Sequence, residues 1–173
     1  MVGFNVAQLL KSEPGASREY DLDEDIAGID EELDVIRPLT GRIRLLRTDN
    51  GILVTGHLQT AARVPCRRCL VPVVLPVEMD LEEQFRPSVD ICTGATIPAE
   101  DGEDEVTRMD GHHMVDLTEV IRQNLLLAIP TSPLCRPNCR GLCPDCGANL
   151  NEESCNCQRQ ERDPRLAALH ELL

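Results

Sequence analysis

Aromatic side chains are almost absent from this sequence. Its 173 residues include no tryptophan, one tyrosine (Tyr20) and two phenylalanines (Phe4 and Phe85). The hydrophobic core must therefore be built from valine, isoleucine and leucine. Few aromatic rings also leave few platforms on which unpaired bases can stack, which argues against a protein that grips single-stranded nucleic acid by base stacking.

Long apolar runs are missing as well. No stretch approaches the roughly 18 apolar residues that a membrane-spanning helix needs. The N-terminal segment has no basic region, and its apolar run is too short for a signal peptide. We therefore expect a cytoplasmic protein without membrane contact. In that reducing compartment, nine cysteines are better explained as metal ligands than as a disulfide framework.

The sequence also lacks the common signatures of catalysis. There is no Walker loop, dinucleotide fingerprint or nucleophile elbow, and no H-E-x-x-H or H-x-E pattern of a catalytic zinc site. The adjacent residues His112 and His113 are interpreted as solvated loop residues rather than ligands. We expect neither an enzyme activity nor a small-molecule substrate.

Positive charge is scarce but concentrated. The net charge of −13 excludes generic adhesion to nucleic acid or anionic lipid. Residues 37–70 nevertheless hold seven arginines against one acid, whereas residues 19–34 hold nine acids and no base, and residues 78–119 hold thirteen acids and two arginines. The acidic runs are interpreted as solvated surface or loop. In the alternative interpretation, the arginines of residues 37–70 form a basic face of the sheet, and the acidic runs surround it.

Alternating hydrophobicity predicts a small antiparallel sheet. Residues 41–48 form the first clear strand, Asp49-Asn50-Gly51 predicts a type I′ turn, and residues 52–60 return with Ile52, Val54 and Leu58 facing the core. A second hairpin is predicted from residues 62–64 and 70–79, with a C-x-x-C tip at residues 66–69. Pro72 and Pro76 place its second arm at a sheet edge.

Three helices are expected in addition to this sheet. Asn5 would cap a short helix over residues 6–11, and a third helix would follow Asp163-Pro164. The main helix, residues 116–129, would begin with a capping pattern of Asp116 and Glu119. It would present five residues to the core: Leu117, Val120, Ile121, Leu125 and Leu126.

These elements predict an α+β fold, a small antiparallel β-sheet packed by one main helix, with a cysteine-rich, zinc-binding C-terminal tail. The expected domains are residues 1–130, which include the C-x-x-C hairpin tip and an acidic loop at about residues 87–112, and residues 131–173, which hold the tail and the terminal helix.

Closely spaced cysteines predict metal sites, because a C-x-x-C turn places two sulfurs on one side of a tetrahedral zinc site. One natural set of four lies in the tail: Cys143, Cys146, Cys155 and Cys157. Gly147, directly after the second sulfur, lets backbone amides face the thiolates. Core or redox cysteines do not occur in such pairs flanked by Gly, Pro and Arg.

The remaining pairs form a second set that joins the hairpin tip to the start of the tail: Cys66, Cys69, Cys135 and Cys139. Another partition stays open, with one site made of Cys135, Cys139, Cys143 and Cys146 and the other of Cys66, Cys69, Cys155 and Cys157. We favour the first, because the three-residue spacing makes Cys139 and Cys143 a poor pair within one site. Either partition binds two structural zinc ions and leaves Cys92 without a role.

Several segments, spread across most of the chain, are distinctive when taken together: NVAQLLK, REYDL, GRIRLLRTDNGILVTG, CRRCL, EEQFRP, DLTEVIRQNLLLAIPTSPLCRPNCRGLCPDCGANLN, CNC and DPRLAALHELL. Together they resemble the YceD-like family (DUF177), the large ribosomal RNA subunit accumulation proteins of bacteria and plastids. The CRRC tip, the cysteine tail and DPRLAAL are the most specific parts. The resemblance implies a role in 23S ribosomal RNA accumulation and ribosome assembly, through RNA or an early ribosomal protein, and no enzyme activity.

Three functions are compared. In the first, an assembly factor contacts ribosomal RNA through arginine forks, which suit phosphates and guanine edges. The candidate contacts are Arg67 and Arg68 between the two sulfurs, with Arg42, Arg44 and Arg47 on a shared face. These arginines would otherwise pair with the chain's own carboxylates. The second function is an acidic chaperone for a basic ribosomal protein, and the third and least favoured is a thiol or zinc enzyme.

Overall fold

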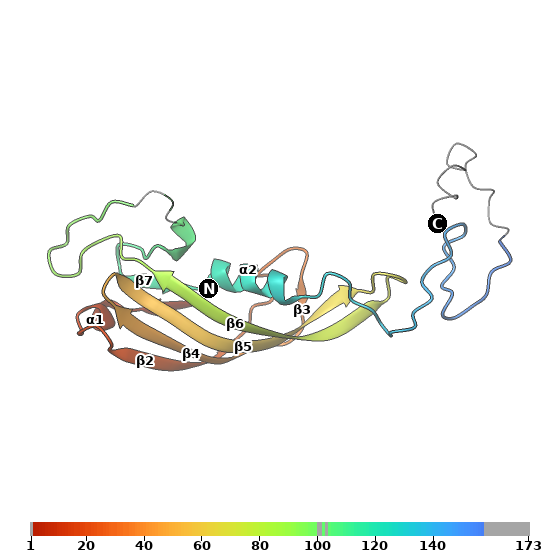
Figure 1. Cartoon of the computed structure of the whole chain (residues 1–173), viewed down its shortest axis with the longest axis horizontal. Coiled ribbons are helices and arrows are strands. Elements are labelled where there is room, and N and C mark those ends of the chain that lie inside the picture. The colour runs from red at the N-terminus through yellow and green to blue at the C-terminus, as the bar shows by residue number, and fades with distance from the viewer. Residues whose placement is uncertain (1, 100–101, 103, 158–173) are drawn as a thin grey trace, which may run out of the picture. The chain divides into compact units, whose positions relative to one another are not determined.

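The computed structural model describes residues 2–99, 102 and 104–157. Its elements, shown in Figure 1, are β1 (Gly3–Asn5), α1 (Ala7–Leu10), β2 (Ser17–Glu24), β3 (Asp34–Val35), β4 (Leu39–Thr48), β5 (Gly51–Pro65), β6 (Pro72–Phe85), the 3-10 helix η1 (Glu105–Thr107), β7 (Met114–Asp116) and α2 (Thr118–Ala128). Antiparallel sheets with one main helix confirm the α+β class. The helix predicted after Asp163 lies outside the described residues. No helix of the described chain is long and apolar enough to cross a membrane.

The chain divides into two compact units. The first unit comprises Met1–Val64 and Val73–Thr131, and the second comprises Pro65–Pro72 together with the chain from Ser132 onward. The tip of the β5–β6 hairpin thus groups with the C-terminal segment, although the sequence analysis assigned it to the first domain.

Strand β5 is the longest strand of the five-stranded sheet. It pairs antiparallel with β4 from Gly51 to Gln59, and β4 pairs antiparallel with β2. Farther along, β5 pairs with β3 at Ala62 and Arg63. Strand β6 pairs only with β5 within the described chain, so it lies at an edge as its prolines predicted. Strands β1 and β7 form a separate two-stranded sheet.

The first hairpin forms where it was predicted, but with a different turn. Thr48 pairs with Gly51, so Asp49 and Asn50 are the turn residues, and neither has the positive φ of a type I′ turn. The glycine is needed for another reason, because a Cβ at Gly51 would clash with the carbonyl oxygen of Phe85 at the end of β6. Residues 62–64 are not a separate strand, since β5 continues through them to Pro65.

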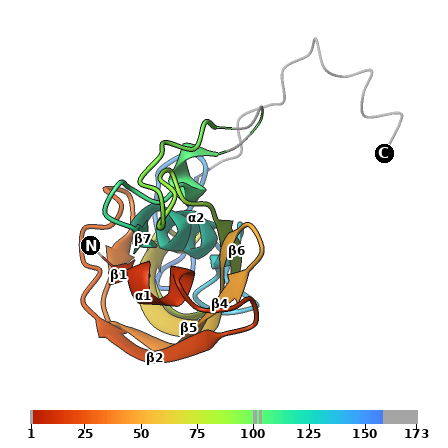
Figure 2. The same cartoon turned by 90° about the vertical axis from the view of Figure 1, so that its left-hand side faces the viewer.

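The core lies between the sheet and α2, which covers one face of the sheet (Figures 1 and 2). The residues predicted to face inward from β5 are fully buried: Ile52, Val54 and Leu58. Four of the five predicted from the main helix are also buried: Leu117, Val120, Ile121 and Leu125. The prediction that Leu126 faces the core is wrong. It is 42% exposed, because it follows Leu125 by about 100° around the helix.

Asp116 holds the start of α2. Its Oδ1 accepts hydrogen bonds from the Thr118 amide at 2.9 Å and the Thr118 hydroxyl at 2.6 Å. Glu119 does not complete a capping box, because its carboxylate instead accepts from Arg122 at 2.7 Å. Arg122 also donates to Asp30 at 2.8 Å, which ties the acidic segment before β3 to the helix.

The acidic loop after β6 has local structure. The Asp90 carboxylate accepts hydrogen bonds from the Cys92 and Thr93 amides at 3.0 and 2.7 Å, which makes a tight turn. Cys92 is exposed at this turn. His112 is exposed as expected. His113 also lies in the loop, but it is half-buried rather than fully solvated. Its backbone is left-handed (φ 60°), and its buried Nδ1 has no hydrogen-bond partner among the described residues.

Candidate metal centres

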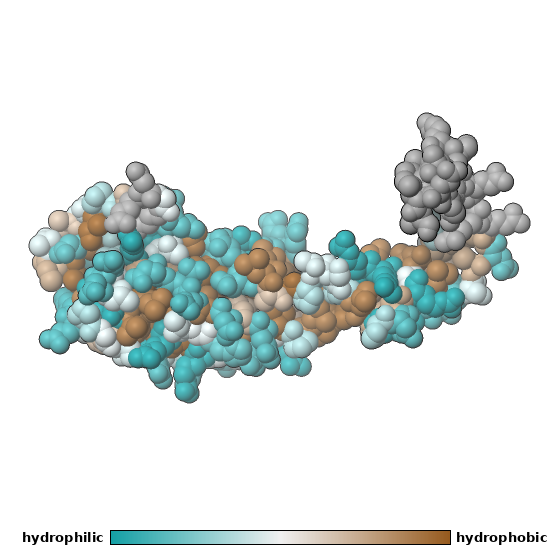
Figure 3. All heavy atoms as spheres, viewed as in Figure 1, coloured by the Kyte–Doolittle hydropathy of each residue, from teal (hydrophilic) through white to brown (hydrophobic). Residues whose placement is uncertain are grey.

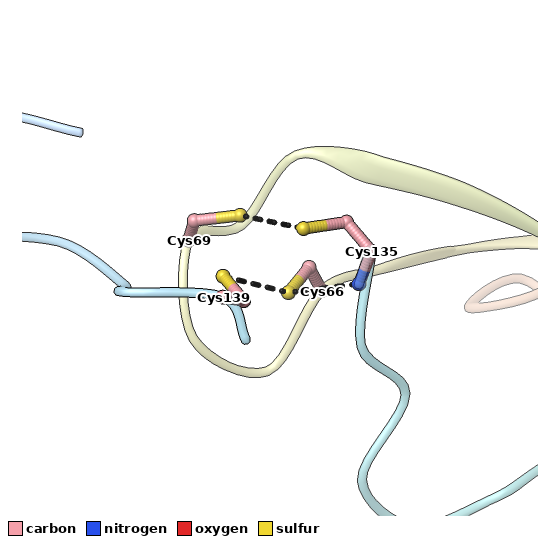
Figure 4. Close-up of side chains that lie close together, drawn as sticks. All are labelled: Cys66, Cys69, Cys135 and Cys139. Carbon is pink, nitrogen blue, oxygen red and sulfur yellow. Dashed lines mark hydrogen bonds between the residues drawn. The ribbon is translucent and has the colours of Figure 1, made fainter. Parts of the chain in front are cut away.

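Eight of the nine cysteines gather in two clusters within the second unit. The first cluster is Cys66, Cys69, Cys135 and Cys139, and the second is Cys143, Cys146, Cys155 and Cys157. Within each cluster the four Sγ atoms lie within 4.8 Å of one another. This grouping is the partition that the spacing argument favoured. Figure 4 shows the first cluster, where sulfurs from the hairpin tip and from the tail point toward one another.

The sulfur spacing fits a tetrahedral zinc ion. A Zn–S bond of about 2.3 Å places the sulfurs about 3.8 Å apart at the corners of a tetrahedron. In the first cluster, the Cys66 and Cys139 sulfurs are 3.9 Å apart, and those of Cys69 and Cys135 are 3.6 Å apart. All nine cysteines are free rather than disulfide-bonded. Four thiolates close the zinc shell, which suits a structural ion and leaves no position for a substrate.

The two C-x-x-C turns have the same backbone hydrogen bonds. The Leu70 amide donates to the Cys66 carbonyl, and the Gly147 amide donates to the Cys143 carbonyl, both at 2.9 Å. The reverse bonds also correspond: Cys66 N to Val71 O at 2.9 Å, and Cys143 N to Ala148 O at 2.8 Å. Both turns require a left-handed residue after the second sulfur, with φ 60° at Leu70 and 76° at Gly147.

Backbone amides in each turn stabilise the first sulfur as a thiolate. A hydrogen bond from the Cys69 amide, despite the opposing effect of burial, lowers the pKa of Cys66 to about 6. The Cys146 and Asp145 amides lower the pKa of Cys143 to about 7 in the same way. Because zinc binds the thiolate form, each turn presents one sulfur that is ready to bind near neutral pH.

Other sulfurs in the clusters retain their protons more strongly when no metal is bound. Burial, followed by hydrogen bonding with the Cys69 sulfur, raises the pKa of Cys135 to about 12. Hydrogen bonding with the Cys146 sulfur raises the pKa of Cys157 to about 12. A metal ion must displace these protons, so acid competes with metal at both clusters.

Asn151 connects the two clusters. It lies in the loop between the cysteine pairs of the second cluster, yet its Nδ2 donates to the Cys139 sulfur of the first at 3.3 Å. Its Oδ1 accepts from the Arg140 amide at 2.8 Å. Burial raises the pKa of Cys139, but hydrogen bonds from Asn151 and the Gly141 amide outweigh it and bring the pKa below its usual value. The sequence analysis did not single out Asn151, because a loop asparagine carries no distinctive pattern.

Arg42 and Arg44 lie on the exposed face of β4, where both contact β2. Arg42 donates to the Asp21 carboxylate at 2.9 Å, and Arg44 donates to the Ser17 hydroxyl at 3.2 Å. The Arg42–Asp21 pair raises the pKa of Arg42 further above its usual value. The alternative in which arginines pair with the chain's own carboxylates therefore holds for Arg42.

Arg47 does not share this face, so the prediction of one face for the three β4 arginines is wrong. Alternate residues of a strand point to opposite sides, and Arg47 has the same parity as the buried residues Ile43 and Leu45. Its guanidinium donates to the carbonyls of Leu10 at 3.3 Å and Gly51 at 3.1 Å. Arg47 thus holds backbone segments of the first unit together.

The tip arginines lie beside the first cluster. Arg67 and Arg68 are both exposed, and the Arg68 guanidinium donates to the Cys139 carbonyl at 2.8 Å. Two further exposed arginines, Arg136 and Arg140, directly follow cysteines of the same cluster. The sequence analysis missed this second pair, because it counted charge along the chain rather than around each predicted zinc ion.

The excess of negative charge is confined to the first unit. That unit carries 24 acidic and 10 basic residues, whereas the second unit carries 6 acidic and 7 basic residues. The two units therefore differ in the kind of partner that each attracts electrostatically.

The two clusters of four cysteines define a chain with two candidate metal sites. The family comparison is more specific. The YceD family, described as large ribosomal RNA subunit accumulation protein YceD, matches residues 54–173. The chain belongs to this family, which is named for accumulation of a ribosomal RNA and not for an enzyme activity.

Individual relatives include one that carries the same name. The chain is 38% identical to uncharacterized protein Rv2926c of Mycobacterium tuberculosis over 76% of this chain and 60% of that protein. It is 28% identical to the maize large ribosomal RNA subunit accumulation protein YCED homolog 1, chloroplastic, over 70% of this chain and 49% of that protein. It is 30% identical to uncharacterized protein YlbN of Bacillus subtilis, over 64% of this chain and 59% of that protein. The chain thus spans about half to three fifths of these relatives' length. No solved structure matches.

Proposed function

We propose that this chain promotes accumulation of the large-subunit (23S) ribosomal RNA as a bacterial assembly factor, and that its second unit contacts that RNA. Family membership supports the ribosomal role. The observation that carries the RNA contact is the set of four exposed arginines interleaved with the cysteines of the first cluster: Arg67, Arg68, Arg136 and Arg140.

Zinc suits both clusters, and each zinc ion would have a structural rather than a catalytic role. A zinc ion with four thiolates has a net charge of −2, which the four arginines around the first cluster more than balance. The contact surface therefore stays cationic when metal is bound. Free thiols and zinc–thiolate sites both fit the reducing cytoplasm.

Arginine suits this role because its planar guanidinium binds phosphate oxygens through two parallel hydrogen bonds. Arg67 and Arg68 are on a turn that the metal would fix, so little backbone freedom is lost on binding. Arg42 is less suitable, since it lies beside Asp21 on the acidic first unit. We therefore place the RNA contact at the tip rather than on β4.

Filter binding of a 23S ribosomal RNA fragment over a salt series tests this assignment. Arg67→Ala/Arg68→Ala should weaken binding and reduce the salt slope by about 2, since each phosphate contact contributes about 1. The matched control is Arg42→Ala/Arg44→Ala, which removes the same charge from the first unit and should leave the slope unchanged. Absence of wild-type binding at low salt, or equal losses in the two variants, would overturn the assignment.

A second candidate is an acidic chaperone for a basic ribosomal protein, favoured by the 24 acidic residues of the first unit. In this case partner binding depends on the first unit and needs no RNA. Affinity capture with the full chain before and after nuclease treatment separates the two candidates. A ribosomal protein that stays bound after RNA digestion, and also binds the Arg67→Ala/Arg68→Ala variant, would support the chaperone.

A further inference from the structure

The first C-x-x-C turn contains a leucine where its backbone favours glycine. Leu70 has φ 60°, and the corresponding residue of the second turn is Gly147 with φ 76°. The hydrogen bonds around the two positions correspond one to one, so the same left-handed conformation is imposed on both. Only glycine adopts this conformation without steric strain. Leu70 is therefore the unfavourable choice for the turn itself.

Packing within the chain does not explain the leucine. Its side chain is 62% exposed, so most of its apolar surface remains in water. Glycine would relieve the backbone strain and remove this exposed surface at once. Residues held in strained conformations occur disproportionately at binding sites, which makes a leucine that is both strained and exposed a candidate contact residue.

The neighbouring residues extend this surface and suggest what it contacts. Val71, the next residue of the same unit, is 39% exposed. Hydrophobic residues reach the visible surface along the β5–β6 hairpin (Figure 3). Arg67 and Arg68 precede Leu70 and Val71 at the tip. The tip thus combines exposed apolar side chains with guanidinium groups. This combination suits a partner that carries negative charge and also exposes apolar surface.

We propose that Leu70 is an apolar anchor that packs against unpaired nucleotides of an RNA whose phosphates Arg67 and Arg68 bind. This inference rests on the proposed function and identifies the kind of RNA. A paired A-form helix hides its base faces, and its deep, narrow major groove does not admit side chains. Loops and bulges expose base and ribose surfaces that a leucine contacts. Because this contact is aliphatic and needs no aromatic ring to stack on a base, the tip recognises unpaired rather than duplex RNA even in a chain with few aromatic residues.

Leu70→Gly in the zinc-loaded full chain tests the anchor. The probes are a labelled RNA hairpin with a large unpaired loop and a fully paired duplex with the same number of phosphates. We expect affinity for the looped hairpin to fall about tenfold, since a buried leucine contributes on that scale. Duplex binding should stay unchanged. The salt slope should also stay unchanged, because leucine neutralises no phosphate.

Two further measurements separate a lost contact from a damaged fold. Leu70→Gly should keep its zinc content and melt at a higher temperature than the wild type, because glycine relaxes the left-handed residue. The control Leu127→Ala removes an 84% exposed leucine from α2 in the first unit and should leave RNA affinity unchanged.

The outcomes distinguish this inference from the proposed function on which it rests. If the wild type binds neither RNA, the proposed function fails. If the wild type binds and Leu70→Gly binds the looped hairpin equally well, only the anchor is overturned. The anchor is also overturned if Leu70→Gly loses capture of a nuclease-resistant protein partner while its RNA affinity is unchanged, since Leu70 then contacts a protein.

Discussion

Replacing Asn151 with alanine tests whether the two clusters are coupled. The carboxamide donates to the Cys139 sulfur at 3.3 Å and accepts from the Arg140 amide at 2.8 Å. A hydrogen bond contributes about 1 kcal/mol net, and about 1.5–3 kcal/mol when one partner is charged, as a zinc-bound thiolate is. Loss of these two bonds should cost about 2.5–4 kcal/mol. The carboxamide also donates to Asn149 Oδ1 at 2.8 Å and accepts from Arg136 at 3.3 Å. We expect the zinc affinity of the first cluster to fall about 10- to 100-fold, the usual range for partners of metal ligands.

Competition with a chromophoric chelator measures this loss, because the two zinc ions would be released at different chelator concentrations. Asn138→Ala is a matched control. Asn138 lies between two ligands of the first cluster and is exposed, and its side chain makes no hydrogen bond within residues 2–99, 102 and 104–157. If Asn151→Ala retains both zinc ions as tightly as the wild type, Asn151 does not couple the clusters.

Three further substitutions test the first unit by urea unfolding. Gly51→Ala should lower the unfolding free energy by about 1–3 kcal/mol, because its Cβ meets the Phe85 carbonyl; an unchanged value would contradict the close approach of β5 and β6. Arg42→Ala should change it by less than about 1 kcal/mol, because the ion pair that Arg42 makes is exposed; a larger loss would mean that the pair is structural. Arg122 holds the pKa of Glu119 at about 2, below its usual 4.5, so this contribution is complete above pH 4.5 and is lost as the pH falls toward 2. Arg122→Met should lower stability at pH 7 and flatten this acid dependence, and an unchanged pH profile would count against the assignment.

Local patterns made much of this structure predictable. Strand alternation identified the β4–β5 hairpin and its buried residues, because burial on one face of a sheet enforces a period of two. Cysteine spacing identified both clusters, since a C-x-x-C turn fixes two sulfurs with few residues. The grouping of Cys66 and Cys69 with the start of the tail followed by elimination, because nearer pairs were already better matched.

The sequence-based predictions failed where contacts between residues far apart in the sequence determine the role of a residue. Gly51 was assigned to a type I′ turn, but the constraint on it comes from Phe85, more than thirty residues away. Arg47 was grouped with the exposed arginines, although its partner Leu10 lies on another element. Asn151 was missed because its contact to the first cluster exists only after the second cluster has folded beside it. The helix expected after Asp163 stays a prediction.

Metal content of the full chain, purified under reducing conditions and analysed by native mass spectrometry, tests the central claim most directly. Two zinc ions per chain are expected, one for each cluster. Cys69→Ser/Cys139→Ser and Cys146→Ser/Cys157→Ser should each remove one ion. A chain that carries no metal and keeps the same amide hydrogen-exchange protection at residues 132–157 with and without a chelator would contradict the claim.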